Sequence, residues 1–234
     1  MTNSELQRYF STHVTACGDR GIGNGSRKLL KMVGTFQERA RILDVGCAEG
    51  CILKSLTGLH DVYGVDTSEP LARVARENGF KDVKIADLEG GAIPFEDESF
   101  DLVVSADTLE HIVDTDWIMC EINRVLKPGH RLLLCLPNIR TPVSIIAMLL
   151  GRAPMWAARY RASHVRDFTG RSMRAMCEDS GFRVLRQVGT DFCYSPNPEG
   201  ILPGLASFLP SWSSRVITEA VKVKPAKYEV HEWC

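Results

Sequence analysis

Short apolar runs of strand length alternate along the chain with segments whose apolar residues recur at helical spacing. The runs predict strands over residues 40–45, 61–65, 82–86, 100–106 and 130–137. The last of them, HRLLLCLP, is apolar almost throughout, which is typical of a strand covered on both faces.

Helical segments separate these strands, and we expect helices over residues 26–32, 50–56, 68–79, 116–126 and 169–181. Ser68 and Thr169 are residue types that cap helix N-termini, and Gly79 suits a helix end. Strand–helix alternation implies right-handed crossovers. The predicted fold class is therefore α/β, with a doubly wound, Rossmann-like sheet that is mostly parallel. The runs 182–188 and 215–223 predict an antiparallel hairpin that closes it.

Composition excludes several classes of protein. The 234 residues are 44% hydrophobic and 24% charged, as in a globular chain, and favour a single domain. The longest apolar run, Ile145 to Leu150, is too short to span a bilayer, and MTNSELQRYF lacks a signal-peptide core. Eight scattered cysteines without a C-x-x-C pair predict free thiols. We therefore expect a cytoplasmic protein without a transmembrane segment and without a metal site.

Charge is distributed unevenly although the net charge is −1. Residues 87–121 contain eleven acids and no Lys or Arg, whereas residues 122–166 contain eight Lys or Arg and no acid. These stretches are either solvated faces of neighbouring elements or a basic surface beside a cleft for an anionic substrate. Nucleic acid is a weaker hypothesis, because no basic stripe with interleaved aromatic residues occurs elsewhere.

Candidate chemistry gathers where the first two predicted strands end. Gly46 and Gly50 lie in the turn DVGCAEG, and Asp66 ends the second strand twenty residues beyond Gly46. This spacing is typical of a nucleoside site whose acid accepts hydrogen bonds from ribose hydroxyls. Asp44 and Glu49 would repel a pyrophosphate, which argues against a nicotinamide oxidoreductase. They suit S-adenosylmethionine, which carries ammonium and sulfonium groups.

The motifs resemble those of the class I S-adenosylmethionine-dependent methyltransferases. ILDVGCAEG resembles their first motif, VYGVDTSE the ribose-binding segment, IADLEGGAIPFEDESFDLVVSADTLEHI the adenine-side and fourth-strand motifs, and RVLKPGHRLLLCLPN the fifth-strand motif. The region that follows is similar to the branch containing the methionine-biosynthesis protein MetW and to methyltransferases of sugars and other small polar acceptors. Ala48 departs from the pattern, because the family usually has glycine there.

The resemblance implies a role for each matching residue. Asp44 contacts the methionine amino end, Asp66 holds the ribose, Asp87 and Leu88 flank the adenine, and Ser105 with Ala106 lines the floor beneath the sulfonium. The whole implied cofactor set, for S-adenosylmethionine and its product S-adenosylhomocysteine, is Asp44, Gly46, Cys47, Ala48, Gly50, Asp66, Thr67, Asp87, Leu88, Ser105 and Ala106.

Methyl transfer from a sulfonium is an in-line displacement, helped mainly by alignment and removal of water. A hydroxyl acceptor also needs its proton removed. His111, with Glu110 beside it, is the first candidate for this base, and His164 is the second. The alternative is that His111 packs against or caps the next helix and that His164 is a surface residue.

We expect one methyltransferase domain with four parts: an N-terminal helical cap (1–38), a cofactor-binding core (39–138), a lid insertion (139–168), and a C-terminal helix with closing strands (169–234). Residues 141–166 form a lid over a small, anionic acceptor, a surface that meets a membrane or a partner protein, or an ordinary packed helix. The predicted function is methyl transfer to oxygen of a small polar acceptor. The alternative is a MetW-like partner protein that binds the cofactor with little transfer of its own.

Overall fold

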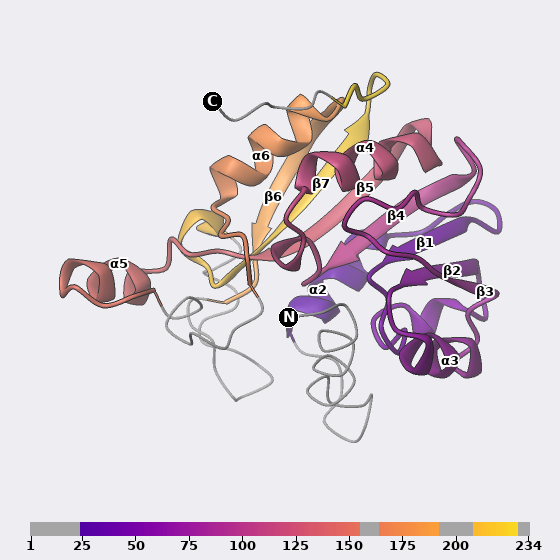
Figure 1. Cartoon of the computed structure of the whole chain (residues 1–234), viewed down its shortest axis with the longest axis horizontal. Helices are drawn as coiled ribbons and strands as arrows, with labels where there is room; N and C mark the ends of the chain where they lie inside the picture. Colours follow the sequence, from indigo (N-terminus) through magenta and orange to yellow (C-terminus); the bar gives the residue numbers. More distant parts are fainter. Residues whose placement is uncertain (1–23, 155–163, 192–207, 229–234) are drawn as a thin grey trace.

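The computed structural model describes residues 24–154, 164–191 and 208–228. They form a seven-stranded sheet with helices on both faces, shown in Figure 1. The strand order is β3-β2-β1-β4-β5-β7-β6. The strands are β1 (Arg41–Val45), β2 (Asp61–Asp66), β3 (Asp82–Ile85), β4 (Phe100–Ala106), β5 (Leu126–Pro137), β6 (Phe182–Gly189) and β7 (Arg215–Lys222).

The sheet confirms the predicted fold class. Strands β3, β2, β1, β4 and β5 pair in parallel, whereas β7 runs antiparallel to both β5 and β6. The buried carboxylate of Glu219 in β7 accepts hydrogen bonds from the guanidinium of Arg131 in β5 at 2.7 Å and from that of Arg186 in β6 at 2.6 Å. The C-terminal hairpin is thereby joined to the parallel core by side chains as well as by backbone.

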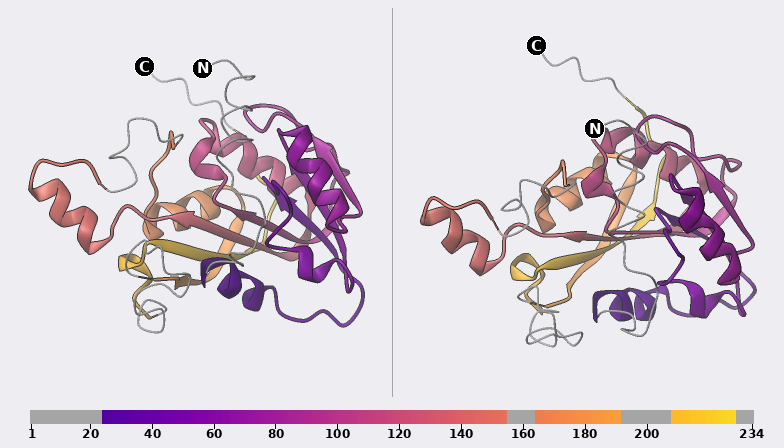
Figure 2. Two further views of the ribbon diagram at one scale, coloured as in Figure 1. Left: turned by 90° about the horizontal axis from the view of Figure 1, so that it is seen from below. Right: turned by 60° about the horizontal axis from the view of Figure 1, so that its bottom comes forward.

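Helices cover the sheet in two layers (Figure 2). Ile118 of α4 and Met173 of α6 pack in one buried cluster, and Leu29 of α2 and Ala75 of α3 pack in the other. Apolar side chains on both faces explain why the central strands read as continuous apolar runs. The helices are α2 (Asn24–Val33), α3 (Glu69–Glu77), α4 (Thr115–Val125), α5 (Pro142–Leu149) and α6 (Gly170–Asp179), with short 3-10 turns η1 (Lys54–Leu56), η2 (Leu109–His111) and η3 (Pro210–Trp212).

Two predicted caps occupy the expected positions. The Thr169 hydroxyl accepts a hydrogen bond of 3.1 Å from the backbone N–H of Ser172 and begins α6. Ser68 is the N-cap residue of α3, although its side chain makes no capping bond. The helix expected over 50–56 is wrong, because those residues form turns followed by η1. Gly50 has φ of +72°, a left-handed conformation that no α-helix contains.

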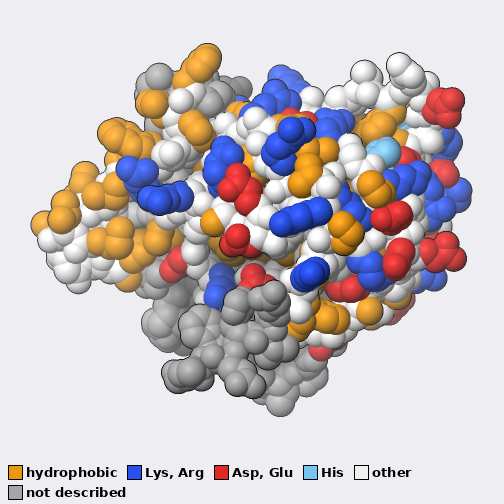
Figure 3. Space-filling view, turned by 90° about the horizontal axis from the view of Figure 1, so that it is seen from above, with side chains coloured by type: hydrophobic (Ala, Val, Ile, Leu, Met, Phe, Trp, Pro, Cys, Tyr) orange, Lys and Arg blue, Asp and Glu red, His pale blue; other side chains and the backbone are white. Residues whose placement is uncertain are grey.

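Helix α5 projects from the body of the molecule, at the left of Figure 1. Ile146, Leu149 and Leu150 are 57%, 81% and 71% exposed, so the structure does not show an ordinary packed helix. Hydrophobic side chains gather on this projecting end in Figure 3. The lid and docking interpretations both stay open, because residues 155–163 of the insertion lie outside the described residues, as do 1–23 of the predicted cap.

Several basic residues of the stretch 122–166 are engaged in ion pairs. Arg124 lies 2.7 Å from Glu121, Lys127 lies 2.7 Å from Asp101, and Arg131 pairs with Glu219. These three side chains are thus paired within the fold, and Arg131 pairs with a buried carboxylate, so it is not part of a solvated face. Within the described ranges, no helix is both long enough and apolar enough to cross a bilayer.

The described cysteines follow the sequence expectation with one exception. Cys47, Cys120, Cys135 and Cys177 are free thiols, and burial raises the pKa of each. Cys51 is disulfide-bonded, so the expectation of a free thiol is wrong there. Disulfide formation depends on proximity in space, which cysteine spacing does not reveal.

Candidate functional site

The carboxyl ends of β1, β2 and β4 meet at one edge of the sheet. Val45 of β1 is paired with Val65 of β2 on one side and with Ser105 of β4 on the other. The chain leaves β1 toward β2 on one side, whereas β4 lies on the other side, so the strand order changes direction here. Ligands of open α/β sheets bind outside such a switch point.

The turn after β1 is tight because two glycines adopt left-handed conformations. Gly46 has φ of +76°, and a Cβ atom on it would lie 2.2 Å from Oγ1 of Thr108. A Cβ atom on Gly50 would lie 2.4 Å from the ring of Phe80. The backbone N–H of Gly46 donates to the carbonyl of Val65 at 2.9 Å, which holds the turn against the end of β2.

Ala48 also adopts a left-handed conformation, with φ of +45°. This conformation costs a residue with a Cβ atom about 1–2 kcal/mol. The position therefore favours the glycine that the resemblance leads one to expect. The backbone N–H of Ala48 donates to Oδ2 of Asp66 at 2.8 Å, and the N–H of Ser68 donates to Oδ1 at 2.9 Å.

Two buried carboxylates lie beside this turn. Asp44 is 3% exposed and Asp66 is 9% exposed. Burial, and then the charge of Asp66, raises the pKa of Asp44 to about 7. Burial also raises the pKa of Asp66, although the hydrogen bonds from the N–H groups of Ser68 and Ala48 act to lower it. A cation bound here would stabilise both ionised carboxylates.

The end of β3 brings the next expected residues to the same edge. The backbone N–H of Ala86 donates to the carbonyl of Asp66 at 3.1 Å, so Asp87 and Leu88 follow directly beside it. Leu88 is buried, whereas Asp87 is exposed and accepts a hydrogen bond of 3.0 Å from the N–H of Glu89. An apolar surface with an acceptor at its rim is suited to an adenine ring.

Side chains at the end of β4 hold the strands together. The fully buried Ser105 hydroxyl donates to the carbonyl of Val45 at 3.0 Å, so it joins β4 to β1. Ala106 is partly exposed at the strand end. Cys47 is buried and Thr67 is partly exposed at the ends of the β1 and β2 segments, which places the expected cofactor set along one edge.

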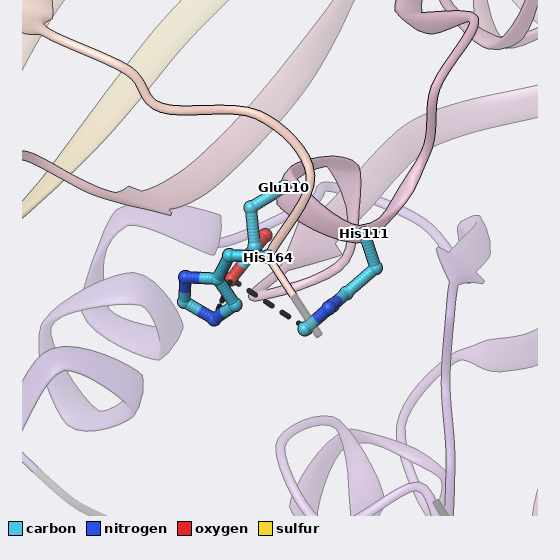
Figure 4. A group of neighbouring side chains, drawn as sticks. All are labelled: Glu110, His111 and His164. Atoms are coloured by element: carbon cyan, nitrogen blue, oxygen red, sulfur yellow. Dashed lines mark ion pairs between the residues drawn. The ribbon is translucent and has the colours of Figure 1, made fainter. Parts of the chain in front are cut away.

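The three candidate catalytic side chains come together, as Figure 4 shows. Glu110 and His111 lie in η2, directly after β4, and His164 lies at the end of the insertion. Nε2 of His111 is 4.0 Å and Nε2 of His164 is 3.9 Å from Oε1 of Glu110. The imidazole centroids are 4.8 Å apart at an interplanar angle of 75°. We call these three residues the Glu–His–His cluster.

Backbone hydrogen bonds hold the cluster together. The N–H groups of Val165 and Arg166 donate to the carbonyl of Glu110 at 2.8 and 3.1 Å. Burial, with a contribution from the charge of Asp107, raises the pKa of Glu110 well above its usual value. Burial, and then His111, lowers the pKa of His164. The cluster thus favours neutral forms of its acid and of this imidazole.

Sequence reasoning missed two contributors to the site. Thr108 fills the space above Gly46 and donates to the carbonyls of Val45 and Ala106 at 3.3 and 3.1 Å. Arg215 of β7 pairs with Asp107 at 2.9 Å, beside the cluster. The close approach at Gly46 indicates a neighbour such as Thr108, but no local pattern connects Arg215 with Asp107.

Comparison with known proteins finds a family model that matches part of the chain. Residues 43–134 match the family model described as "Methyltransferase domain". Phosphoethanolamine N-methyltransferase 2 of Caenorhabditis elegans is 32% identical over 46% of this chain and 26% of its own length. Ubiquinone biosynthesis O-methyltransferase of Xanthomonas oryzae pv. oryzae (strain PXO99A) is 33% identical over 55% of this chain and 56% of its own length. The chain thus spans about half or less of these relatives.

Solved structures share the fold over nearly the whole chain. An S-adenosylmethionine-dependent methyltransferase from Thermotoga maritima matches with a TM-score of 0.65 and 21% identity, over 94% of this chain and 95% of that one. The similarity therefore extends beyond the family match to the C-terminal strands.

Proposed function

We propose that this chain, whose residues 43–134 match the methyltransferase family model, is a class I S-adenosylmethionine-dependent methyltransferase that transfers the methyl group of this cofactor to a hydroxyl oxygen of a small polar acceptor. The methyl donor of the family is S-adenosylmethionine, and its product is S-adenosylhomocysteine. Both the atom methylated and the acceptor class are part of the proposal.

The observation that carries the proposal is the buried pair Asp44 and Asp66 at the left-handed turn. The charge of Asp66 acts on Asp44, and burial raises the pKa of Asp44 to about 7. The ammonium and sulfonium groups of S-adenosylmethionine would relieve this repulsion, whereas a pyrophosphate would add to it. The pair therefore supports this cofactor over a nicotinamide dinucleotide.

The residues implied by the family divide among the parts of the cofactor. Asp44 and the turn (Gly46, Cys47, Ala48 and Gly50) take the methionine end, and Asp66 with Thr67 takes the ribose. The Asp66 carboxylate accepts backbone hydrogen bonds from Ala48, Ser68 and Thr67, and a carboxylate offers about four lone pairs, so it can also accept from a ribose hydroxyl. Asp87 and Leu88 take the adenine, and Ser105 with Ala106 lies beneath the sulfonium.

The Glu–His–His cluster follows β4 directly and therefore adjoins the expected sulfonium position. In the reaction, an oxygen lone pair of the acceptor forms the new O–C bond as the C–S bond breaks. The electron pair of the C–S bond stays on sulfur, which leaves neutral S-adenosylhomocysteine. The acceptor hydroxyl loses its proton at the cluster, which is the role we assign to Glu110, His111 and His164.

The acceptor is proposed from two lines of support. The Xanthomonas relative is named for O-methylation in ubiquinone biosynthesis, which favours a hydroxylated, quinol-like compound. The exposed Arg166 lies two residues after His164, and its guanidinium donates to the carbonyl of Val113 at 2.9 Å, close to the cluster in the chain. An acidic group on the acceptor would meet it, with residues 141–166 as the lid over the bound compound.

A direct test combines binding with turnover. The purified chain is titrated calorimetrically with S-adenosylmethionine, S-adenosylhomocysteine and NAD in parallel, and we expect micromolar binding of the first two alone. Isotope-labelled cofactor is then offered with a catechol carboxylic acid, the same catechol without its carboxyl group, and a primary amine. We expect label on the catechols and more on the acid. Binding of NAD alone contradicts the proposal, and cofactor binding without any transfer supports the partner-protein alternative.

A further inference from the structure

The Glu–His–His cluster combines two imidazoles and a carboxylate within a small volume. One ligand atom from each of Glu110, His111 and His164 lies within 4.8 Å of the other two. The side chains converge from two segments, the turn after β4 and the end of the insertion (Figure 4). Two imidazoles with one carboxylate are a typical ligand set for divalent transition metals.

The buried carboxylate provides a second, independent observation. Glu110 is 1% exposed, and its Oε2 has no hydrogen-bond partner within the described part of the chain. An unsatisfied buried carboxylate oxygen costs free energy unless a proton or a cation compensates it. The charge of Asp107 also acts on Glu110, although Arg215 pairs with Asp107 at 2.9 Å.

The distances require a small movement for an ion to bind. In a tetrahedral site with bonds of about 2.0–2.1 Å, ligand atoms lie about 3.4 Å apart. The two imidazole Nε2 atoms now lie 4.0 and 3.9 Å from Oε1 of Glu110. Each nitrogen must approach Oε1 of Glu110 by about 0.5 Å, and the ligand atoms of the two imidazoles, which lie within 4.8 Å of each other, by up to about 1.4 Å. The backbone bonds from Val165 and Arg166 to Glu110 keep the two segments adjacent.

We propose that Glu110, His111 and His164 bind one divalent transition-metal ion, of the zinc class, with an open position toward the acceptor. Nitrogen ligands favour such an ion over Mg²⁺, which prefers oxygen ligands. The inference rests on the proposed function in one respect: the acceptor hydroxyl would occupy the open position. The inference refines the role proposed above for the cluster: a bound ion would lower the pKa of the acceptor hydroxyl, whose proton would then pass to water, and the two histidines would act as ligands of the ion instead of as bases.

The test measures metal binding without cofactor or acceptor. The full chain is freed of metal with a chelator, dialysed, and titrated with Co²⁺ while visible absorption is recorded. Zn²⁺ is then added as competitor. We expect one Co²⁺ per chain, with absorption typical of a nitrogen- and oxygen-ligated ion that Zn²⁺ abolishes. Glu110→Gln and His164→Ala should each weaken binding by at least about 100-fold, because loss of outer-shell partners alone costs 10- to 100-fold.

His130→Ala is the matched control, since His130 is a partly exposed imidazole 3.6 Å from Asp101 in the amino-terminal half of β5, whereas the cluster follows the carboxyl end of β4. It should bind Co²⁺ as the unchanged chain does. Binding of S-adenosylmethionine reports that each variant is folded. Absence of stoichiometric binding, or equal binding by both cluster variants and the unchanged chain, overturns the inference.

The outcomes separate this inference from the proposed function. Variant-sensitive Co²⁺ binding supports the metal site even when no acceptor is methylated, in which case the proposed function alone fails. Methylation of the catechol acid at an unchanged rate by metal-free protein overturns the metal's role and leaves the proposed function standing.

Discussion

Oδ2 of Asp66 accepts a hydrogen bond of 2.8 Å from the backbone N–H of Ala48. The carboxylate at the end of β2 therefore supports the turn that follows β1, in addition to its proposed contact with the ribose. One residue thus links the shape of the turn to cofactor affinity, and substitutions around this bond distinguish the two roles.

Replacement of Asp66 should weaken cofactor binding strongly. In Asp66→Ala the ribose hydroxyls lose a charged acceptor, worth about 1.5–3 kcal/mol, so affinity should fall roughly 10- to 100-fold. Calorimetric titration with S-adenosylhomocysteine measures the change. Asp82→Ala is the control, because Asp82 lies at the amino end of β3, whereas the site lies at the carboxyl ends of the strands. Its carboxylate pairs with Lys84 at 2.8 Å. Equal affinity of Asp66→Ala and the unchanged chain would refute the assignment.

Substitution of Gly46 should be far more damaging than its backbone angle alone explains. Gly46 and Gly129 have similar φ of +76° and +74°, but a Cβ atom would meet Thr108 at Gly46 and nothing within 4 Å at Gly129. Gly129→Ala should therefore destabilise the chain by about 1–2 kcal/mol, the left-handed penalty. Gly46→Ala should destabilise it further and abolish cofactor binding. Urea unfolding of both variants gives the comparison, and equal destabilisation would contradict the predicted clash.

Ala48→Gly should stabilise the chain and improve cofactor affinity. The substitution removes the penalty at φ of +45°, so we expect a gain of about 0.5–1 kcal/mol in the free energy of unfolding. Thermal unfolding with and without S-adenosylmethionine measures both effects. In Ala175→Gly, at an exposed position of α6, the same replacement should instead destabilise by about 0.5–1 kcal/mol. A loss of stability in Ala48→Gly would show that the turn is not strained.

Stability without cofactor should depend on the ionisation of Asp44. Because the pKa of Asp44 is raised to about 7 in the folded chain, its ionised form is disfavoured there. The contribution of protonated Asp44 to the free energy of unfolding is complete below about pH 4, the ordinary pKa of an aspartate. It is lost as the pH rises through about 7. The urea midpoint should therefore fall between pH 5 and about 8 in the unchanged chain, and less in Asp44→Asn.

The same ionisation should couple to cofactor binding. A cationic ligand favours the ionised carboxylate, so binding near pH 6.5 should release protons. Calorimetry in two buffers of different ionisation enthalpy measures this release, and Asp44→Asn should reduce it. Proton uptake, or release unchanged in the variant, would argue against contact between the cationic end and Asp44.

Much of the fold follows from local patterns in the sequence. The alternation of apolar strands with helices predicts the parallel core, and FDLVVSA coincides with β4 at Phe100–Ala106. The helix expected over 50–56 fails because Gly50 is left-handed, a conformation set by its approach to Phe80 rather than by helical spacing. The apolar face of α5 is visible in the sequence, but its exposure is not.

The sequence by itself determined the glycine turn, Asp44 and the distal Asp66, because strand ends and turn residues are local features whose spacing places them at one sheet edge. The tertiary structure alone decided that His164 meets Glu110 and His111, and that Arg215 pairs with Asp107. These contacts join segments far apart in the chain. They depend on how β7 and the insertion pack against the core, which periodicity and residue spacing do not encode.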